Sequence, residues 1–214
     1  MLLINNLKVS FKEKNVLQNL NLNISKGEIF GILGKNGAGK TTLFQSIYQN
    51  INYSGEILID NTKASKTKIG FVETENYFYP YMLGNEYLSF FKDIKNLKTD
   101  FVKKFDIPLK KYIDSYSTGM KKKIALTGTI LLDKPFLILD EPFNGLDFES
   151  VEILYSVIKD LKNNNKTILI SSHILETLTN TCDRIGILKN GMIENIFSKS
   201  DFPEMIDNRD TFIL

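Results

Sequence analysis

Three shortages in this sequence of 214 residues exclude whole classes of protein. It has a single cysteine, Cys182, so it cannot form an internal disulfide, which favours a reducing compartment and a small buried thiol. Its 27 basic and 25 acidic side chains leave a net charge of only +2, so no nucleic-acid partner is expected. No stretch approaches the ~18 consecutive apolar residues that would span a bilayer, and the apolar start at 1–4 is too short for a signal peptide. We therefore expect a cytoplasmic protein that reaches a membrane only through a partner.

The spacing of apolar residues predicts an α/β fold. Leucine or isoleucine alternates with asparagine over 19–24, which predicts a strand within a β-rich first 25 residues. Residues 185–188 and 192–197 are predicted to form a hairpin across Asn190-Gly191. The other predicted strands are 28–33, 56–60, 69–72, 136–140 and 167–171, and the predicted helices are 42–49, 148–161 and 174–181. Strands that alternate with helices imply a mostly parallel sheet wrapped by helices.

The middle of the chain, from about Leu83 to Leu132, has helical spacing and no convincing strand. Apolar residues recur there at Tyr87, Phe90, Phe91 and Ile94. We therefore predict a single domain over 1–214. A β-rich subdomain and an α/β core, about 1–75 and 133–214, enclose a helical insert of about 76–132.

The segment Gly-Lys-Asn-Gly-Ala-Gly-Lys-Thr at 34–41 fits the pattern G-x-x-x-x-G-K-[ST] of a phosphate-binding loop, between a predicted strand and a predicted helix. Glycines let the backbone amides approach phosphate oxygens, and the helix points its positive end at the same anion. Lys40 should reach the β- and γ-phosphates, and the Thr41 hydroxyl should bind Mg²⁺. A chance glycine-rich turn is the alternative, which the Lys-Thr pair and both flanks disfavour. The predicted nucleotide contacts are Gly34, Lys35, Asn36, Gly37, Ala38, Gly39, Lys40, Thr41 and Thr42.

Two carboxylates follow the apolar strand predicted at 136–140. Ligands bind at the carboxyl ends of strands in open α/β sheets, so Asp140 suits the Mg²⁺ shell and Glu141 suits a general base for the attacking water. Two solvated acids at a strand end are the alternative. His173, the only histidine, follows the strand predicted at 167–171. From the residues alone, a γ-phosphate contact and a structural role are equally favoured for it.

In this order, the motifs resemble the ATP-binding subunit of an ABC transporter of the exporter-like (ABC-2 type) branch, from Leu3 to about Phe197. The most specific piece is 116–120, Tyr-Ser-Thr-Gly-Met, which resembles the family's signature loop. The resemblance implies a P-loop NTPase core with a mostly parallel sheet, an N-terminal antiparallel β subdomain and a helical insert. It also implies ATP and Mg²⁺ as cofactors, and an ATP hydrolase whose ATP-driven dimer closure powers transport.

The resemblance implies roles for five further positions. Ser117 and Gly119 would contact the γ-phosphate held by a second nucleotide-binding subunit, in a homo- or heterodimer. Asp147, with the two residues before it, resembles the loop that crosses the dimer interface. His173 matches the switch histidine that senses the γ-phosphate, and Phe11 lies near the aromatic residue that stacks on adenine.

Two positions depart from the family pattern. Thr118 stands where the signature usually has its first glycine, and threonine is costly there if the backbone needs a positive φ. After the strand at 69–72 the family usually has glutamine, whereas this chain reads Glu73-Thr74-Glu75. Glu73 would bind Mg²⁺ or its water, and a one-residue shift would select Thr74 or Glu75 instead.

Two surface segments keep alternatives open. The triplet 121–123, all lysine, favours a solvated helix face. The segment 77–82, Tyr-Phe-Tyr-Pro-Tyr-Met, suits a surface that docks the cytoplasmic helix of a membrane partner, with core aromatics as the alternative. By resemblance, the partners are transmembrane permease subunits at the inner face of the cell membrane. The rival functions are a soluble ATPase of the same family, a nucleotide switch without turnover and a P-loop kinase.

We predict that Lys40→Ala abolishes ATP binding, because Lys40 supplies the positive charge that meets the β- and γ-phosphates. Titration calorimetry with ATP measures the affinity directly. An unchanged affinity would remove 34–42 from the nucleotide site.

Overall fold

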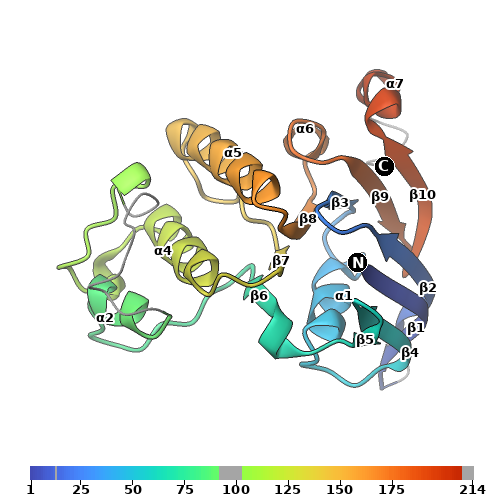
Figure 1. The fold of residues 1–214 in the computed structure, drawn as a ribbon, viewed down its shortest axis with the longest axis horizontal. Coiled ribbons are helices and arrows are strands. Elements are labelled where there is room, and N and C mark those ends of the chain that lie inside the picture. The colour runs from blue at the N-terminus through green and yellow to red at the C-terminus, as the bar shows by residue number, and fades with distance from the viewer. Residues whose placement is uncertain (13, 92–102, 209–214) are drawn as a thin grey trace.

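The computed structural model describes residues 1–12, 14–91 and 103–208 and contains two sheets with helices around them (Figure 1). The first sheet is antiparallel, in the order β2-β1-β4-β5. Its strands are β1 (Leu2–Phe11), β2 (Lys14–Ile24), β4 (Ser54–Ile59) and β5 (Thr62–Lys63). The second sheet has the order β10-β9-β3-β8-β7-β6, and only its β9–β10 pairing is antiparallel. Its strands are β3 (Ile29–Leu33), β6 (Ile69–Val72), β7 (Phe136–Leu139), β8 (Thr167–Ser172), β9 (Arg184–Lys189) and β10 (Met192–Ser198).

Helices cover both faces of the mostly parallel sheet. They are α1 (Lys40–Ile47), α2 (Gly84–Ser89), α4 (Thr118–Leu131), α5 (Phe148–Asn163), α6 (Leu175–Thr179) and α7 (Phe202–Asp207). Short 3₁₀ segments lie at η1 (Lys66–Lys68), η3 (Ile113–Ser115) and η4 (Lys199–Asp201). Figure 1 shows α1 between the two sheets, and α4, α5 and α6 away from the antiparallel sheet.

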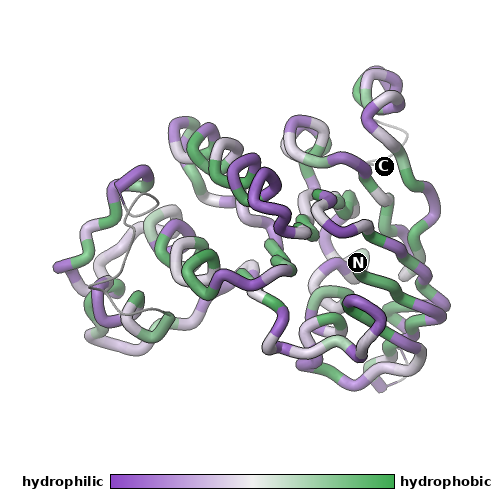
Figure 2. The backbone as a smooth tube through the Cα atoms, in the orientation of Figure 1, coloured by the Kyte–Doolittle hydropathy of each residue, from purple (hydrophilic) through white to green (hydrophobic). Residues whose placement is uncertain are grey.

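Each central strand contributes to two hydrophobic cores. Leu137 and Leu139 of β7 join the core under α4, α5 and α6, whereas Phe136 and Ile138 join the core with α1 and the antiparallel sheet. All four side chains are at most 2 % exposed, because helices and a second sheet cover the two faces. Two-sided burial explains why β7 reads as a continuous apolar run, which is typical of parallel strands. In Figure 2 the same inner strands are green, and polar residues mark the outer turns.

The structure confirms the predicted class of fold and most predicted elements. Leu20, Leu22 and Ile24 are buried, and the asparagines between them are exposed, as the alternation predicted. The hairpin forms across Asn190 and Gly191. Helix α1 begins at Lys40, two residues before the predicted start, and α7 was not predicted.

The insert is helical in the part that the structure describes. Residues 76–91 and 103–132 contain helices and no strand. Helix α2 ends at Ser89, so Phe90 caps it and is 71 % exposed instead of continuing an apolar face. Ile94 lies outside the described residues, and the division into core and insert stays a prediction.

The parallel register brings four loops to one edge of the sheet. Leu33 pairs with Ser172, Leu139 with Ile170, and Val72 with Leu139, so β3, β6, β7 and β8 end side by side. The segments that follow these strands are 34–39, 73–75, 140–141 and 173. These are the segments that the sequence singled out, and their common edge is where α/β sheets bind ligands.

Arg184 links the two sheets. Its Nε donates to Glu28 Oε1 at 2.6 Å, and its Nη2 donates to Glu28 Oε2 at 3.1 Å and to the Asn23 carbonyl at 2.8 Å. Glu28 is only 8 % exposed, so removal of the guanidinium would leave a buried carboxylate without its partner.

We predict that Arg184→Met lowers the free energy of unfolding by about 2–3 kcal/mol. This loss is somewhat smaller than the loss on breaking a fully buried ion pair, because the Arg184 side chain keeps some contact with water. Urea denaturation measures the loss. Lys8→Met, which removes an exposed charge on β1, is the control and should change stability by less than about 0.5 kcal/mol. Equal losses in the two variants would contradict the assigned link.

Candidate functional site

The phosphate-binding loop closes around the ammonium group of Lys40. Lys40 Nζ donates to the Gly34 carbonyl at 2.6 Å and to the Lys35 carbonyl at 3.2 Å, and the side chain is 6 % exposed. Gly37 and Gly39 have φ of +83° and +106°, a region that favours glycine. Gly39 is also the N-cap of α1, so the positive end of that helix faces the loop.

A hydroxyl on either side orients Asp140, which is fully buried at the end of β7. Thr41 Oγ1 donates to Asp140 Oδ2 at 2.7 Å, and Ser171 Oγ donates to Asp140 Oδ1 at 2.5 Å. Ser171 also accepts a hydrogen bond from the Glu141 amide at 2.9 Å. A single serine on β8 therefore fixes both acidic residues.

Glu141 lies between two basic side chains. Its Oε1 is 3.1 Å from Lys40 Nζ, and its Oε2 is 3.0 Å from His173 Nδ1. The contact with Lys40 is an ion pair without an aligned hydrogen bond, so the buried Oε1 accepts none from the described residues. Glu141 also has φ of +48°, an uncommon conformation for this residue type and one that occurs at functional sites.

Thr41 and Asp140 fit a magnesium ion. Mg²⁺ prefers oxygen ligands and takes one or two from the protein, the rest coming from water and phosphates. The hydroxyl and carboxylate are adjacent, and the described residues contain no cluster of three or more His, Cys, Asp or Glu that could replace them. Glu73 lies just past β6, but its Oε1 accepts from Gln45 Nε2 at 2.6 Å and no described contact joins it to Asp140.

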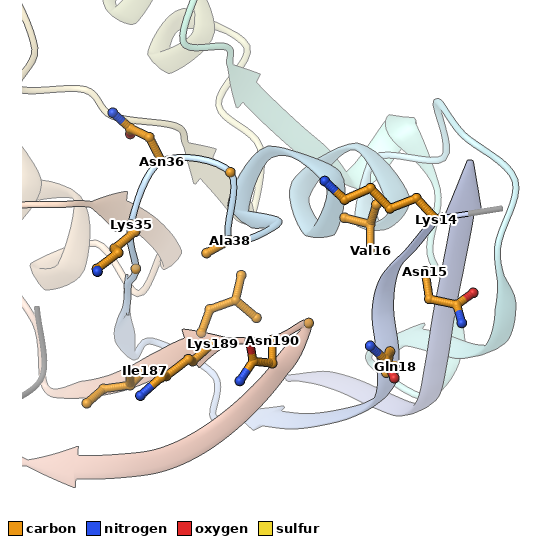
Figure 3. Close-up of a pocket in the computed structure, with 14 residues that line it drawn as sticks. Lys14, Asn15, Val16, Gln18, Lys35, Asn36, Ala38, Ile187, Lys189 and Asn190 are labelled. Atoms are coloured by element: carbon orange, nitrogen blue, oxygen red, sulfur yellow. The ribbon is translucent and has the colours of Figure 1, made fainter. Parts of the chain in front are cut away.

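A pocket of about 500 Å³ opens beside the loop (Figure 3). Residues 34–38, the start of β2 and the β9–β10 turn surround it, and Lys14, Lys35 and Lys189 give it positive charge. Phe11 does not line this pocket. It is 50 % exposed and pairs in the β1–β2 register with Lys14, which does line it.

The signature segment lies apart from the loop of the same chain. Ser117 is the N-cap of α4 and accepts from the Met120 amide at 3.2 Å. Gly119 packs so closely on the next loop that a Cβ there would lie 2.6 Å from the Gly145 carbonyl oxygen. Asp147 caps α5, and the hydrogen bonds from Ser150 lower its pKa. Among the described residues, no hydrogen bond or ion pair joins Ser117, Gly119 or Asp147 to 34–42.

Residues 17–144 match the family described as ABC transporter, which is more than half of the chain. An ABC transporter ATP-binding protein of Methanocaldococcus jannaschii is 34 % identical over 222 residues, covering 96 % of this chain and 82 % of that protein. The chain belongs to the ABC transporter family. The linearmycin resistance ATP-binding protein of Bacillus subtilis is 33 % identical, covering 94 % of this chain and 70 % of that protein. A solved ATP-binding subunit of an ABC transporter superposes with a TM-score of 0.86 at 25 % identity, covering 98 % of this chain and 94 % of that one.

This ABC protein is therefore an ATP-binding and ATP-hydrolysing subunit of a transporter. A solved ATP-binding cassette at 23 % identity, which superposes with a TM-score of 0.82 over 93 % of this chain and 99 % of that one, is described as dimeric in a post-hydrolysis state. Within the described ranges of this ABC subunit, no helix is long and apolar enough to cross a bilayer.

Thr118 is not strained in the ABC subunit. It is the first residue of α4 and is absent from the non-glycine residues with positive φ. The condition for a costly backbone at this position, a positive φ, is therefore not met, because Thr118 is already part of the helix. The Thr118 methyl instead packs near Gly145, whose ideal Cβ would lie 3.2 Å away.

The lysines of 121–123 were wrongly expected to form a solvated face. Lys122 is 4 % exposed and donates to two backbone carbonyls, and Lys123 pairs with Asp147 Oδ2 at 3.6 Å.

Ser171 was also not singled out from the sequence, although a polar residue at the end of an otherwise apolar strand could have indicated its role. Lys122 had no such signal, because three adjacent lysines do not reveal which one turns inward.

We predict that Thr118→Gly lowers the unfolding free energy of the ABC subunit by about 0.5–1 kcal/mol, the usual cost of glycine in a helix. ATP turnover should stay within about twofold, because the backbone does not need glycine here. Urea denaturation and a phosphate-release assay measure both. A gain in stability would show that Thr118 is strained after all.

Proposed function

We propose that this ABC subunit hydrolyses ATP with Lys40, Glu141 and His173 as the reacting set, and that two subunits drive export through a membrane partner. The observation that carries the proposal is the line of contacts from Lys40 through Glu141 to His173. These contacts join a buried cation, a buried candidate base and a partly exposed histidine beside the phosphate-binding loop.

Glu141 has the geometry of a general base. Its carboxylate is 6 % exposed, and Oε1 is free of aligned hydrogen-bond donors among the described residues, so it can accept a proton from water that attacks the γ-phosphate. Lys40 is then drawn from the carboxylate toward the phosphate, where it stabilises the charge of the transferred group. His173, on the other oxygen, holds Glu141 in place and would contact the same phosphate.

Thr41 and Asp140 would hold Mg²⁺, which supplies charge neutralisation at the β- and γ-phosphates when bound. The two hydrogen bonds to Asp140 support this role, because they aim the carboxylate at the Thr41 hydroxyl. Asp140 is proposed as the second protein residue that would hold the ion, beside Thr41. Glu73 is proposed as a contact to Mg²⁺ or its water through the carboxylate oxygen that Gln45 does not bind.

A second subunit would complete the site. Ser117 and Gly119 stand at the N-terminus of α4, whose positive end suits a γ-phosphate, yet among the described residues no hydrogen bond or ion pair joins them to 34–42 of their own chain. The head-to-tail dimer of the family would bring them to the loop of the other subunit. Asp147 would cross the interface beside them.

The aromatic segment offers a surface for a permease. Tyr77, Tyr79 and Tyr81 are 75 %, 62 % and 80 % exposed, whereas Phe78 and Met82 pack on the core. Phe78 and Met82 therefore fit the interpretation as core residues, whereas the exposed tyrosines suit the docking of a partner helix. The relative named for linearmycin resistance supports export, with the subunit peripheral at the inner face of the membrane. The soluble ATPase is not favoured.

We predict that Glu141→Gln lowers ATP turnover by about 10²-fold or more, because glutamine cannot take the proton from water. ATP binding is retained, so the variant should accumulate as an ATP-bound dimer in size-exclusion chromatography. Glu204→Gln, an exposed change on α7, is the control and should behave as the wild type. Normal steady-state turnover in Glu141→Gln would exclude Glu141 as the base.

A further inference from the structure

Lys122 is a buried cation that the proposed chemistry does not use. It lies on α4, five residues after Ser117, and is 4 % exposed. Burial lowers its pKa, and the negative charges of Asp140 and Glu141 act in the opposite direction. Burial of an ammonium group is unfavourable unless hydrogen bonds and charges compensate it, and an apolar residue of the same size would avoid that penalty.

The Lys122 ammonium binds one loop. Nζ donates to the Thr74 carbonyl at 2.7 Å and to the Glu73 carbonyl at 3.0 Å. This loop follows β6 at the edge of the sheet where Asp140 also stands. Lys122 therefore joins the helix that carries the signature segment to the nucleotide edge of the same chain.

The same loop also contacts the helix of the phosphate-binding loop. Glu73 Oε1 accepts a hydrogen bond from Gln45 Nε2 at 2.6 Å, and Gln45 lies on α1, one turn after Thr41. Glu73 and Thr74 thus connect α1, whose N-terminus faces the nucleotide, with α4, whose N-terminus presents Ser117. The connection is made by three hydrogen bonds to two consecutive residues.

We propose that Lys122 is a positioning residue that couples the phosphate site of its own subunit to the orientation of Ser117 toward the other subunit. Nucleotide binding acts on α1, the 73–75 loop follows through Gln45, and Lys122 transmits the shift to α4. The inference rests on the proposed dimer, in which Ser117 completes the partner's site. It assigns a task to one lysine of a triplet that sequence alone cannot distinguish.

The test compares Lys122→Met with Lys166→Met in the full chain. Lys166 is a matched control, because its side chain is 16 % exposed and donates to the Asp133 carbonyl at 2.9 Å and to Asp133 Oδ1 at 2.6 Å. It precedes β8, whereas His173 follows that strand, so Lys166 lies at the opposite edge of the sheet. Both changes remove an ammonium group and its bonds to a loop.

We expect Lys122→Met to lower kcat for ATP by about tenfold or more, because small misplacements of reacting groups have effects of this size. ATP-dependent dimerisation should fall with kcat, while ATP affinity of the monomer, from calorimetry, stays within about threefold. Lys166→Met should keep kcat within about twofold of the wild type, even if its melting temperature falls as far as that of Lys122→Met. A normal kcat in Lys122→Met, or equal losses in both variants, would overturn the proposal.

Gln45→Ala tests the other end of the connection and removes no charged side chain. It should lower kcat by a smaller factor, and the double variant with Lys122→Met should fall no more than about twofold below Lys122→Met alone, since both act through one loop. If the kcat losses of the two single variants multiply in the double variant, the proposed coupling is overturned. If Lys122→Met does not fold, a normal kcat in Gln45→Ala would by itself overturn the coupling. Absence of ATP turnover in the wild type would instead contradict the proposed function.

Discussion

The ion pair between Lys40 and Glu141 is the contact on which the site depends. Both side chains are almost completely buried, and each would be unfavourable without the other. The ammonium is fixed by the hydrogen bonds that it donates to the Gly34 and Lys35 carbonyls, and His173 fixes the far side of the carboxylate. In this arrangement the lysine and the proposed base neutralise one another. A triphosphate would compete for Lys40 and release Glu141, so binding and activation would be one event.

The parallel sheet makes that contact possible. Lys40, Asp140 and His173 are separated by up to 133 positions in the sequence, yet β3, β7 and β8 are neighbours and end at one edge. Ser171 on β8 aims Asp140 and holds the Glu141 amide, which helps to keep Glu141 in its uncommon backbone conformation. The two cores on the faces of the sheet fix the strands, and the loops between them carry the chemistry.

Much of this could be predicted, because strand burial and glycine-rich turns leave local signals. The loop 34–41, the acids after β7 and the hairpin at Asn190 were all placed correctly by pattern. The positions that could not be predicted depend on contacts far apart in the chain. Lys122 turns inward only because the 73–75 loop presents two carbonyls to it, and Thr118 is relaxed only because α4 begins there. Phe11, which by resemblance lies near the aromatic residue that stacks on adenine, does not line the pocket, and its role stays a prediction.

The exchange of Lys40 between Glu141 and a triphosphate can be tested by a structure of the chain bound to ATP and Mg²⁺ with hydrolysis blocked. We predict that Lys40 Nζ has left Glu141 Oε1 and contacts the γ-phosphate, with Ser117 of a second copy on the opposite side of that phosphate. Thr41 and Asp140 should lie at the metal. A complex in which Lys40 stays paired with Glu141, or in which one chain alone encloses the triphosphate, would contradict this mechanism.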